Sequence, residues 1–250
     1  MTAWVLLRGL MRESRHWGEF PHMFQQAIAA PVVTLDFPGN GSLHELASAS
    51  RVEQMVEHAR AQLRQLGYAP PYRVLALSLG AMVAEAWGEQ HAEELEKMVL
   101  INTSLAPYNP FYYRLRPRNY TILISLLCGS AIRRESLILH LTSNRSHMEN
   151  MQSTLLQWVV YAGQCPISNG NILRQLRAAM RYRAASTAPQ VPTLLLAGQQ
   201  DQLVNVKCSL KLAQSWGCEI RVHPTAGHDL PLDEGAWVVR QIMDWDDIHC

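Results

Sequence analysis

The chain has 250 residues, of which 48% are hydrophobic and 17% charged, and its formal net charge is +1. This length and composition predict a globular protein with one sizeable hydrophobic core. They exclude a disordered or fibrous chain, and the near-zero charge by itself favours neither a nucleic-acid-binding protein nor a membrane-surface protein. Nothing else in the sequence supports a nucleic-acid partner, so we expect none.

Six short apolar runs predict the strands of a parallel sheet covered on both faces, because nearly every position in them is apolar. They are residues 3–9, 31–37, 72–78, 97–103, 191–198 and 219–224. Helical patterns lie at residues 13–30, 45–67, 78–94, 206–216 and 234–247. This alternation predicts an α/β fold with a doubly wound, mostly parallel sheet and right-handed crossovers.

The stretch between the fourth and fifth predicted strands breaks the alternation, because it contains helical patterns and no strand. The candidate helices are residues 118–142 with a break at Gly129, 148–163 and 169–185. Ligands bind at the carboxyl ends of parallel strands, so we expect these helices to form a cap over that edge of the sheet. The expected organisation is a core domain of residues 1–105 and 189–250 with a helical cap of residues 106–188.

Targeting signals and metal motifs are not evident. The N-terminal apolar run is too short for a signal peptide, and residues 121–132, the longest apolar run elsewhere, cannot span a bilayer as a helix. The five cysteines are odd in number and lack a Cys-x-x-Cys spacing, which favours neither a disulfide framework nor a zinc site. We therefore expect a cytoplasmic protein with no transmembrane segment, no metal and no cofactor.

Ser78 stands where the third predicted strand turns into an alanine-rich helix, within the sequence Ala-Leu-Ser-Leu-Gly. A serine at such a joint can cap the helix. Alternatively, it is the nucleophile of the elbow pattern Gly-x-Ser-x-Gly, whose tight turn accepts only small residues two positions before and after the serine. Ala76 and Gly80 meet that requirement.

Two further residues fit a catalytic triad with Ser78. Asp201 follows the fifth predicted strand and His228 follows the sixth, so both lie in loops at the carboxyl edge of the sheet. A serine hydroxyl becomes a good nucleophile when an imidazole takes its proton, and a carboxylate holds that imidazole in position. Taken singly, Asp201 is a turn former and His228 a surface or satisfied core histidine. Asp229 is a rival acid, although adjacent side chains seldom orient each other.

The negative charge that develops on the substrate oxygen needs two N–H donors. Leu79 supplies one at the start of the helix after Ser78, where the helix dipole also favours negative charge. The second donor is expected in the loop after the first strand, where Gly9 allows a close approach and Leu10 follows it.

Together these segments resemble the α/β-hydrolase superfamily across nearly the whole chain. The resemblance rests on LLRGL, SRHW, LDFPGNGSL, ALSLGAMVA, LLLAGQQDQLV and TAGHDLPLDEG. Among its members, the chain is similar to compact bacterial carboxylesterases, a group that includes the biotin-pathway methyl esterase acting on pimeloyl-carrier-protein esters. The resemblance implies the α/β-hydrolase fold and a working Ser-Asp-His triad.

The chain departs from the superfamily pattern at two positions. Ala76 replaces the first elbow glycine, and Arg8 replaces the histidine that normally precedes the oxyanion glycine. Arg8 brings a permanent positive charge, which either pairs with a buried carboxylate or reaches a substrate anion. The pairing is the favoured interpretation.

The arginines are unevenly distributed. Residues 107–190 contain ten arginines and two acidic residues, Glu135 and Glu149, a formal charge of +8, whereas the remainder carries −7. These arginines either pair with the acidic core or recognise an anion such as an acyl carrier protein or an anionic lipid. Arg133 and Arg134, which follow the apolar run 121–132, are the leading candidates for that contact.

Several apolar residues of the expected cap are candidates for an acyl pocket, with ordinary helix packing as the alternative. They are Leu126, Leu127, Leu155, Leu156, Trp158, Val159 and Tyr161.

The sequence therefore predicts a serine hydrolase that cleaves a carboxylic ester through an acyl-enzyme. The substrate would be a small-molecule or acyl ester, including methyl or acyl esters of anionic or carrier-protein-bound acyl groups. A thioesterase, a lysophospholipase or a monoacylglycerol lipase would use the same triad. A non-catalytic ligand receptor on the same fold is the alternative from another class.

Overall fold

The computed structural model describes residues 2–145 and 150–248. Its centre is a six-stranded sheet in the order β2-β1-β3-β4-β5-β6, in which every neighbouring pair is parallel. The strands are β1 (Trp4–Leu7), β2 (Val32–Leu35), β3 (Tyr72–Leu77), β4 (Leu95–Ile101), β5 (Thr193–Gly198) and β6 (Glu219–His223). All six predicted strands are confirmed, and the fold is the α/β-hydrolase fold.

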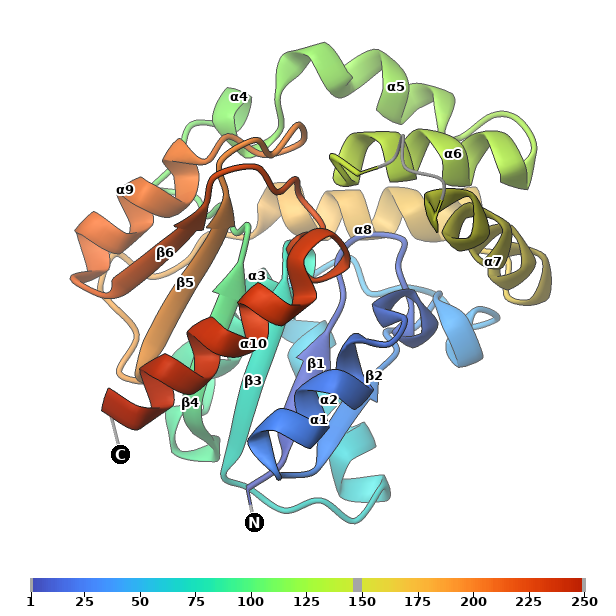
Figure 1. Cartoon of the computed structure of the whole chain (residues 1–250). Coiled ribbons are helices and arrows are strands. Elements are labelled where there is room, and N and C mark those ends of the chain that lie inside the picture. The colour runs from blue at the N-terminus through green and yellow to red at the C-terminus, as the bar shows by residue number, and fades with distance from the viewer. Residues whose placement is uncertain (1, 146–149, 249–250) are drawn as a thin grey trace.

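Helices cover both faces of the sheet (Figure 1). One face carries α2 (Val52–Gln65), α3 (Leu79–Gln90) and α9 (Lys207–Trp216), and the other carries α1 (Phe20–Ile28) and α10 (Leu230–Ile248). Successive residues of β1 point to opposite faces, so Val5 and Leu7 join the first core cluster while Trp4 and Leu6 join the second. Burial on both faces explains why the strands read as continuous apolar runs.

Two predicted helices differ from the observed ones at their starts. The helix expected from residue 13 is a 3₁₀ turn at Ser14–Trp17, followed after Gly18 by α1. Gly18 has a φ of 55°, which breaks a regular helix. The helix expected from residue 45 begins at Val52, because the backbone N–H of the buried Ser48 donates to Asn171 and holds the preceding loop in an irregular path.

The long connection between β4 and β5 is helical. It contains α4 (Phe111–Arg114), α5 (Tyr120–Ser125), α6 (Ala131–Thr142), α7 (Asn150–Gln164) and α8 (Asn169–Arg181). Figure 1 shows these helices above the edge at which the strands end. The break expected at Gly129 lies between α5 and α6, where that residue has a φ of 109°. The start of the helix expected at 148–163, together with Glu149 and Cys250, lies outside the described residues.

The helices of this connection have their own small core. It is formed by Met11, Leu126, Ile138, Leu139, Met151, Trp158 and Ile172. Met11 comes from the loop after β1, so this third cluster joins the helices to the carboxyl edge of the sheet. In the described part of the chain, no helix combines the length and apolar character that crossing a membrane requires.

Candidate active site

Ser78 occupies the joint between β3 and α3 with a φ of 57° and a ψ of −112°. This conformation is strained for a residue with a Cβ, and strain of this kind clusters at functional sites. The Ser78 side chain makes no capping hydrogen bond to α3. The prediction that Ser78 caps the helix is therefore wrong. The strained turn holds a hydroxyl that makes no hydrogen bond to the first turn of α3.

Small residues make this turn possible. A Cβ on Gly80 would lie 2.4 Å from the carbonyl oxygen of Leu7, and a Cβ on Gly9 would lie 3.2 Å from Ser78 Cβ. Ala76, which stands at the first small position of the pattern, is fully buried within β3. The loop after β1 and the joint after β3 are consequently packed directly against each other.

Asp201 and His228 form a buried pair at the ends of β5 and β6. Asp201 Oδ2 lies 2.6 Å from His228 Nδ1, and the residues are 2% and 3% exposed. A carboxylate can only accept, so Nδ1 donates and leaves Nε2 as the acceptor nitrogen that a general base requires. Asp201 Oδ1 also accepts the N–H groups of Leu203 and Val204, so Asp201 shapes its own turn as well.

Ser78 and His228 line the same pocket. Among the described residues, no hydrogen bond joins the Ser78 hydroxyl to the imidazole, and such contacts are often long in proteins without substrate. The structure thus brings the three predicted residues to one edge of the sheet, with a direct contact between Asp201 and His228.

Asn102 positions the loops that carry this pair, and sequence reasoning did not identify it. It follows β4 with a φ of 47° and is 2% exposed. Its amide donates to the carbonyls of Gly227 and His228 at 3.1 and 2.7 Å, and its carbonyl accepts the N–H of Gly198 at 2.9 Å. One side chain therefore connects the ends of three neighbouring strands.

Asp233 anchors the His228 loop from the other side and was likewise not identified. It accepts hydrogen bonds from the Gly227 N–H at 2.7 Å, the Ser143 hydroxyl at 2.6 Å and the Asn144 N–H at 3.1 Å. Burial raises the pKa of this carboxyl above its usual value, and the three hydrogen bonds oppose that rise. The loop is thereby attached to the C-terminal end of α6.

Arg8 pairs with Asp229, the rival acid of the sequence analysis. The guanidinium donates to both carboxylate oxygens at 3.2 and 2.6 Å, and both residues are buried. The guanidinium also lies 4.6 Å from the centre of the Trp17 ring. The favoured interpretation of Arg8 as the partner of a buried carboxylate is confirmed, and Asp229 is therefore engaged away from the imidazole.

Of the two expected oxyanion donors, Leu79 directly follows Ser78 and Leu10 lines the same pocket as Ser78. Leu79 is the first residue of α3, whose leading N–H groups have no partner within the helix. Among the described residues, neither the Leu79 nor the Leu10 N–H donates a backbone hydrogen bond. The next residue along, Met11, is fixed by a 3.0 Å hydrogen bond from its N–H to the Gln175 side chain of α8.

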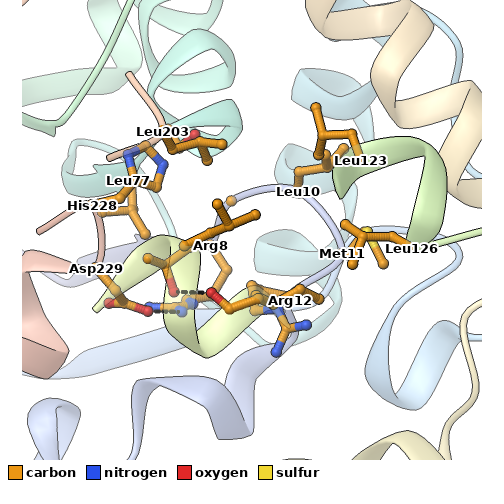
Figure 2. Close-up of a pocket in the computed structure, with 15 residues that line it drawn as sticks. Arg8, Leu10, Met11, Arg12, Leu77, Leu123, Leu126, Leu203, His228 and Asp229 are labelled. Atoms are coloured by element: carbon orange, nitrogen blue, oxygen red, sulfur yellow. Dashed lines mark hydrogen bonds and ion pairs between the residues drawn. The ribbon is translucent and has the colours of Figure 1, made fainter. Parts of the chain in front are cut away.

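The pocket beside Ser78 is small and mainly apolar, with a volume of about 60 Å³. His228 and Leu77 lie on one side of it and Leu10 and Leu123 on the other (Figure 2). Of the apolar cap residues proposed for an acyl pocket, Leu126 lines it. The residues around the cavity come from the loop after β1 and from α5 and α6 as well as from the sheet.

Trp158 does not line this pocket, contrary to the expectation for an acyl-binding residue. It is 3% exposed and packs in the third core cluster, against the His16 ring and below the Arg12 guanidinium. The burial of Trp158 is therefore explained by helix packing, which was the alternative to an acyl pocket.

Arg133 and Arg134 are neighbours on α6 with different surroundings. Arg133 is exposed, whereas Arg134 is half-buried and lines a second pocket that also contains Tyr161. Neither residue lines the pocket beside Ser78.

Comparisons with known proteins place this arrangement in a family. The sequence profile described as serine aminopeptidase, S33, matches residues 4–235. The chain belongs to this family. Membership of this hydrolase family confirms the expectation of an enzyme that cleaves bonds with water. A search of curated protein sequences found no significant match.

Solved structures share the fold with this S33 family member. A thermophilic esterase from Thermogutta terrifontis is 18% identical with a TM-score of 0.79, over 98% of this chain and 89% of that one. An enol-lactonase from Burkholderia xenovorans LB400 is 16% identical with a TM-score of 0.80, over 97% and 90%. The 2-hydroxy-6-oxo-6-phenylhexa-2,4-dienoate hydrolase from Rhodococcus sp. strain RHA1 is 18% identical with a TM-score of 0.78, over 97% and 89%. At these identities the likeness establishes the fold alone.

Proposed function

We propose that this S33 family member hydrolyses carboxylic esters with Ser78, His228 and Asp201 as its catalytic triad. The observation that carries the proposal is the buried Asp201–His228 pair, which opens onto the same pocket as a serine held in a strained elbow. A solvated turn residue and a surface histidine would not be almost completely buried against each other.

The proposed reaction proceeds through an acyl-enzyme. Ser78 Oγ attacks the ester carbonyl while His228 Nε2 takes its proton, and the N–H groups of Leu10 and Leu79 bind the oxygen that becomes negative. The bond to the alcohol then breaks, and His228 returns the proton to the leaving oxygen. Water attacks the acyl-enzyme with His228 again as the base, which releases the carboxylic acid and restores Ser78.

Charge in the pocket favours an ester over a substrate with a free amino terminus. Asp229 is the one carboxylate among the described residues lining the pocket, and Arg8 already neutralises it. An ammonium group there would find no unpaired anionic partner. An ester carbonyl needs none, because the backbone donors bind its oxygen.

The test compares the wild type with Ser78→Ala on p-nitrophenyl acetate, with Ser209→Ala as the control for a buried serine outside the pocket. We expect full activity in the control and a loss of at least about 10³-fold in Ser78→Ala. Matched thioester and aminoacyl-anilide substrates separate the ester proposal from a thioesterase and a peptidase. Equal hydrolysis by wild type and Ser78→Ala would refute the triad.

We also propose that residues 106–188 act as a cap that attracts anionic substrates, such as esters of carrier-protein-bound or lipid acyl groups. Two ion pairs join this segment to the rest of the chain among the described residues, Arg145 with Glu234 and Arg12 with Glu135. Other arginines of the segment are exposed, namely Arg118, Arg133, Arg174, Arg177, Arg181 and Arg183. Pairing with the core therefore accounts for a minority of the positive charge.

Unpaired surface charge of one sign raises the rate at which oppositely charged molecules arrive, and salt screens this effect. We expect kcat/KM for an anionic ester to fall with ionic strength more steeply than for a neutral ester of the same size. The variant carrying Arg174→Glu, Arg177→Glu and Arg181→Glu tests the source of the effect. An unchanged salt dependence in that variant would contradict the role of the cap arginines.

A further inference from the structure

A second pocket lies beside the proposed active site, with a volume of about 120 Å³. It is bounded by the loop after β1, by α6 and by the end of α7. Met11 lines both this pocket and the one beside Ser78, so the two cavities share a wall. The conspicuous polar groups of the second pocket are His16 and Arg134, with the carboxylates of Glu13 and Glu135.

His16 lines this pocket with a buried ring that packs against Trp158 and Tyr161. Its Nδ1 accepts the backbone N–H of Glu13 at 3.1 Å, so the ring proton must reside on Nε2. Burial lowers the pKa of His16 well below its usual value, and the guanidinium groups of Arg12 and Arg8 lower it further. The ring is therefore neutral, and Nε2–H is a buried donor with no partner among the described residues.

Arg134 contributes a second donor in the same situation. Its Nε is buried and has no hydrogen-bond partner among the described residues. Its guanidinium contacts the carbonyl oxygen of Ile167 only at 3.5 Å. A buried donor without an acceptor is costly, and two such donors lining one cavity indicate a missing acceptor.

The two carboxylates of the pocket already have cationic partners. Glu135 Oε2 accepts from Arg12 at 2.7 Å, and Glu13 Oε1 accepts from Arg15 at 2.7 Å. Arg134 is the cation of the pocket that is left without a carboxylate among the described residues. The uncompensated charge in the cavity is therefore positive.

We propose that this second pocket binds a carboxylate, held by the Arg134 guanidinium and the His16 Nε2–H. A guanidinium and a second N–H that line one cavity can each donate to an oxygen of a carboxylate. The carboxylate is either a free small anion or the far end of an ester whose acyl group occupies the neighbouring pocket across Met11. The site goes beyond the proposed catalytic function, because binding of a carboxylate in the second pocket does not require Ser78 to react.

The direct test is calorimetric titration of glutarate into the wild type, Ser78→Ala, Arg134→Gln and Arg133→Gln. Arg133→Gln is the matched control, since Arg133 is the exposed neighbour on the same helix. We expect equal binding to the wild type, Ser78→Ala and Arg133→Gln, and at least about tenfold weaker binding to Arg134→Gln. Weaker binding to Arg134→Gln separates this site from the proposed oxyanion donors, because Arg134 does not line the pocket beside Ser78. Retention in Ser78→Ala separates it from the success of the catalytic proposal.

A kinetic experiment then determines whether the carboxylate belongs to the ester substrate or to a separate anion. Monoethyl succinate and monoethyl glutarate are compared with ethyl butyrate and ethyl valerate, in wild type and in Arg134→Gln. A preference for the acidic esters that Arg134→Gln abolishes assigns the carboxylate to the substrate. Glutarate binding without such a preference assigns the site to a separate anion. No binding by the wild type, or equal binding by Arg134→Gln, would overturn the proposal.

Discussion

Glu85 makes the stability of this protein depend on pH in a predictable direction. It lies on α3, two turns after Ser78, is 2% exposed and accepts a hydrogen bond from the Tyr182 hydroxyl. Burial raises the pKa of this carboxyl from 4.5 to about 7. The Tyr182 hydrogen bond opposes the rise but does not cancel it.

The sign follows from proton binding. Between pH 4.5 and pH 7 the folded chain holds a proton on Glu85 that the unfolded chain has lost, so the free energy of unfolding falls as the pH rises through this range. Each unit of difference between the folded and the unfolded pKa contributes about 1.4 kcal/mol, so the full effect on the free energy of unfolding is about 3 kcal/mol. About 2.5 kcal/mol of it develops between pH 5 and pH 8.

Glu85→Gln keeps the shape and an acceptor oxygen for Tyr182, and it removes the titration. We expect urea unfolding to show that the variant gains about 2.5 kcal/mol relative to wild type between pH 5 and pH 8. Glu45→Gln, at an exposed position whose charge is not among the causes of the Glu85 shift, is the control and is expected to change by less than about 0.5 kcal/mol. A difference between wild type and Glu85→Gln that is the same at both pH values would refute the reasoning.

Three further substitutions test the residues that hold the proposed site together. Arg8→Met leaves a buried carboxylate without its cation, and urea unfolding is expected to show a loss of about 3–5 kcal/mol; a loss below about 1 kcal/mol would contradict this. Asn102→Ala removes three hydrogen bonds around the His228 loop, so kcat for a neutral ester should fall at least about tenfold with KM nearly unchanged. If KM alone changes, Asn102 does not position the imidazole. Gln175→Leu releases the segment after Leu10, and steady-state kinetics should show a similar loss in kcat; unchanged kcat would show that the oxyanion loop holds its place without this contact.

Local sequence patterns were sufficient to predict the strands of the sheet and the order of the three proposed catalytic residues along the chain. Each strand is buried on both faces, so each appears as a continuous apolar run, and the loops at the carboxyl ends follow directly from the strand positions. Ser78, Asp201 and His228 could be selected because Ser78 directly follows a recognisable strand and the other two lie in the loops after recognisable strands.

The supporting polar residues could not be found in this way. Asn102 bonds to groups more than a hundred positions away in the sequence, and Gln175 reaches back from α8 to Met11. Such contacts leave no periodicity in the local sequence, because they are created by the folding of distant segments against each other. His16 could not be linked to Arg134 from the sequence, and the structure shows that both line the second pocket.

The hydrogen bond from Met11 to Gln175 couples α8 to the loop beside the proposed site. Gln175 also donates to Asn40 and Ser48, so α8 is fastened both to the loop that carries the Leu10 amide and to the loop after β2. A displacement of α8 would pull on the loop that carries the Leu10 amide, the proposed donor to the charged oxygen. A substitution that displaces α8 is therefore expected to disturb that amide, although no described residue of α8 lines the pocket beside Ser78.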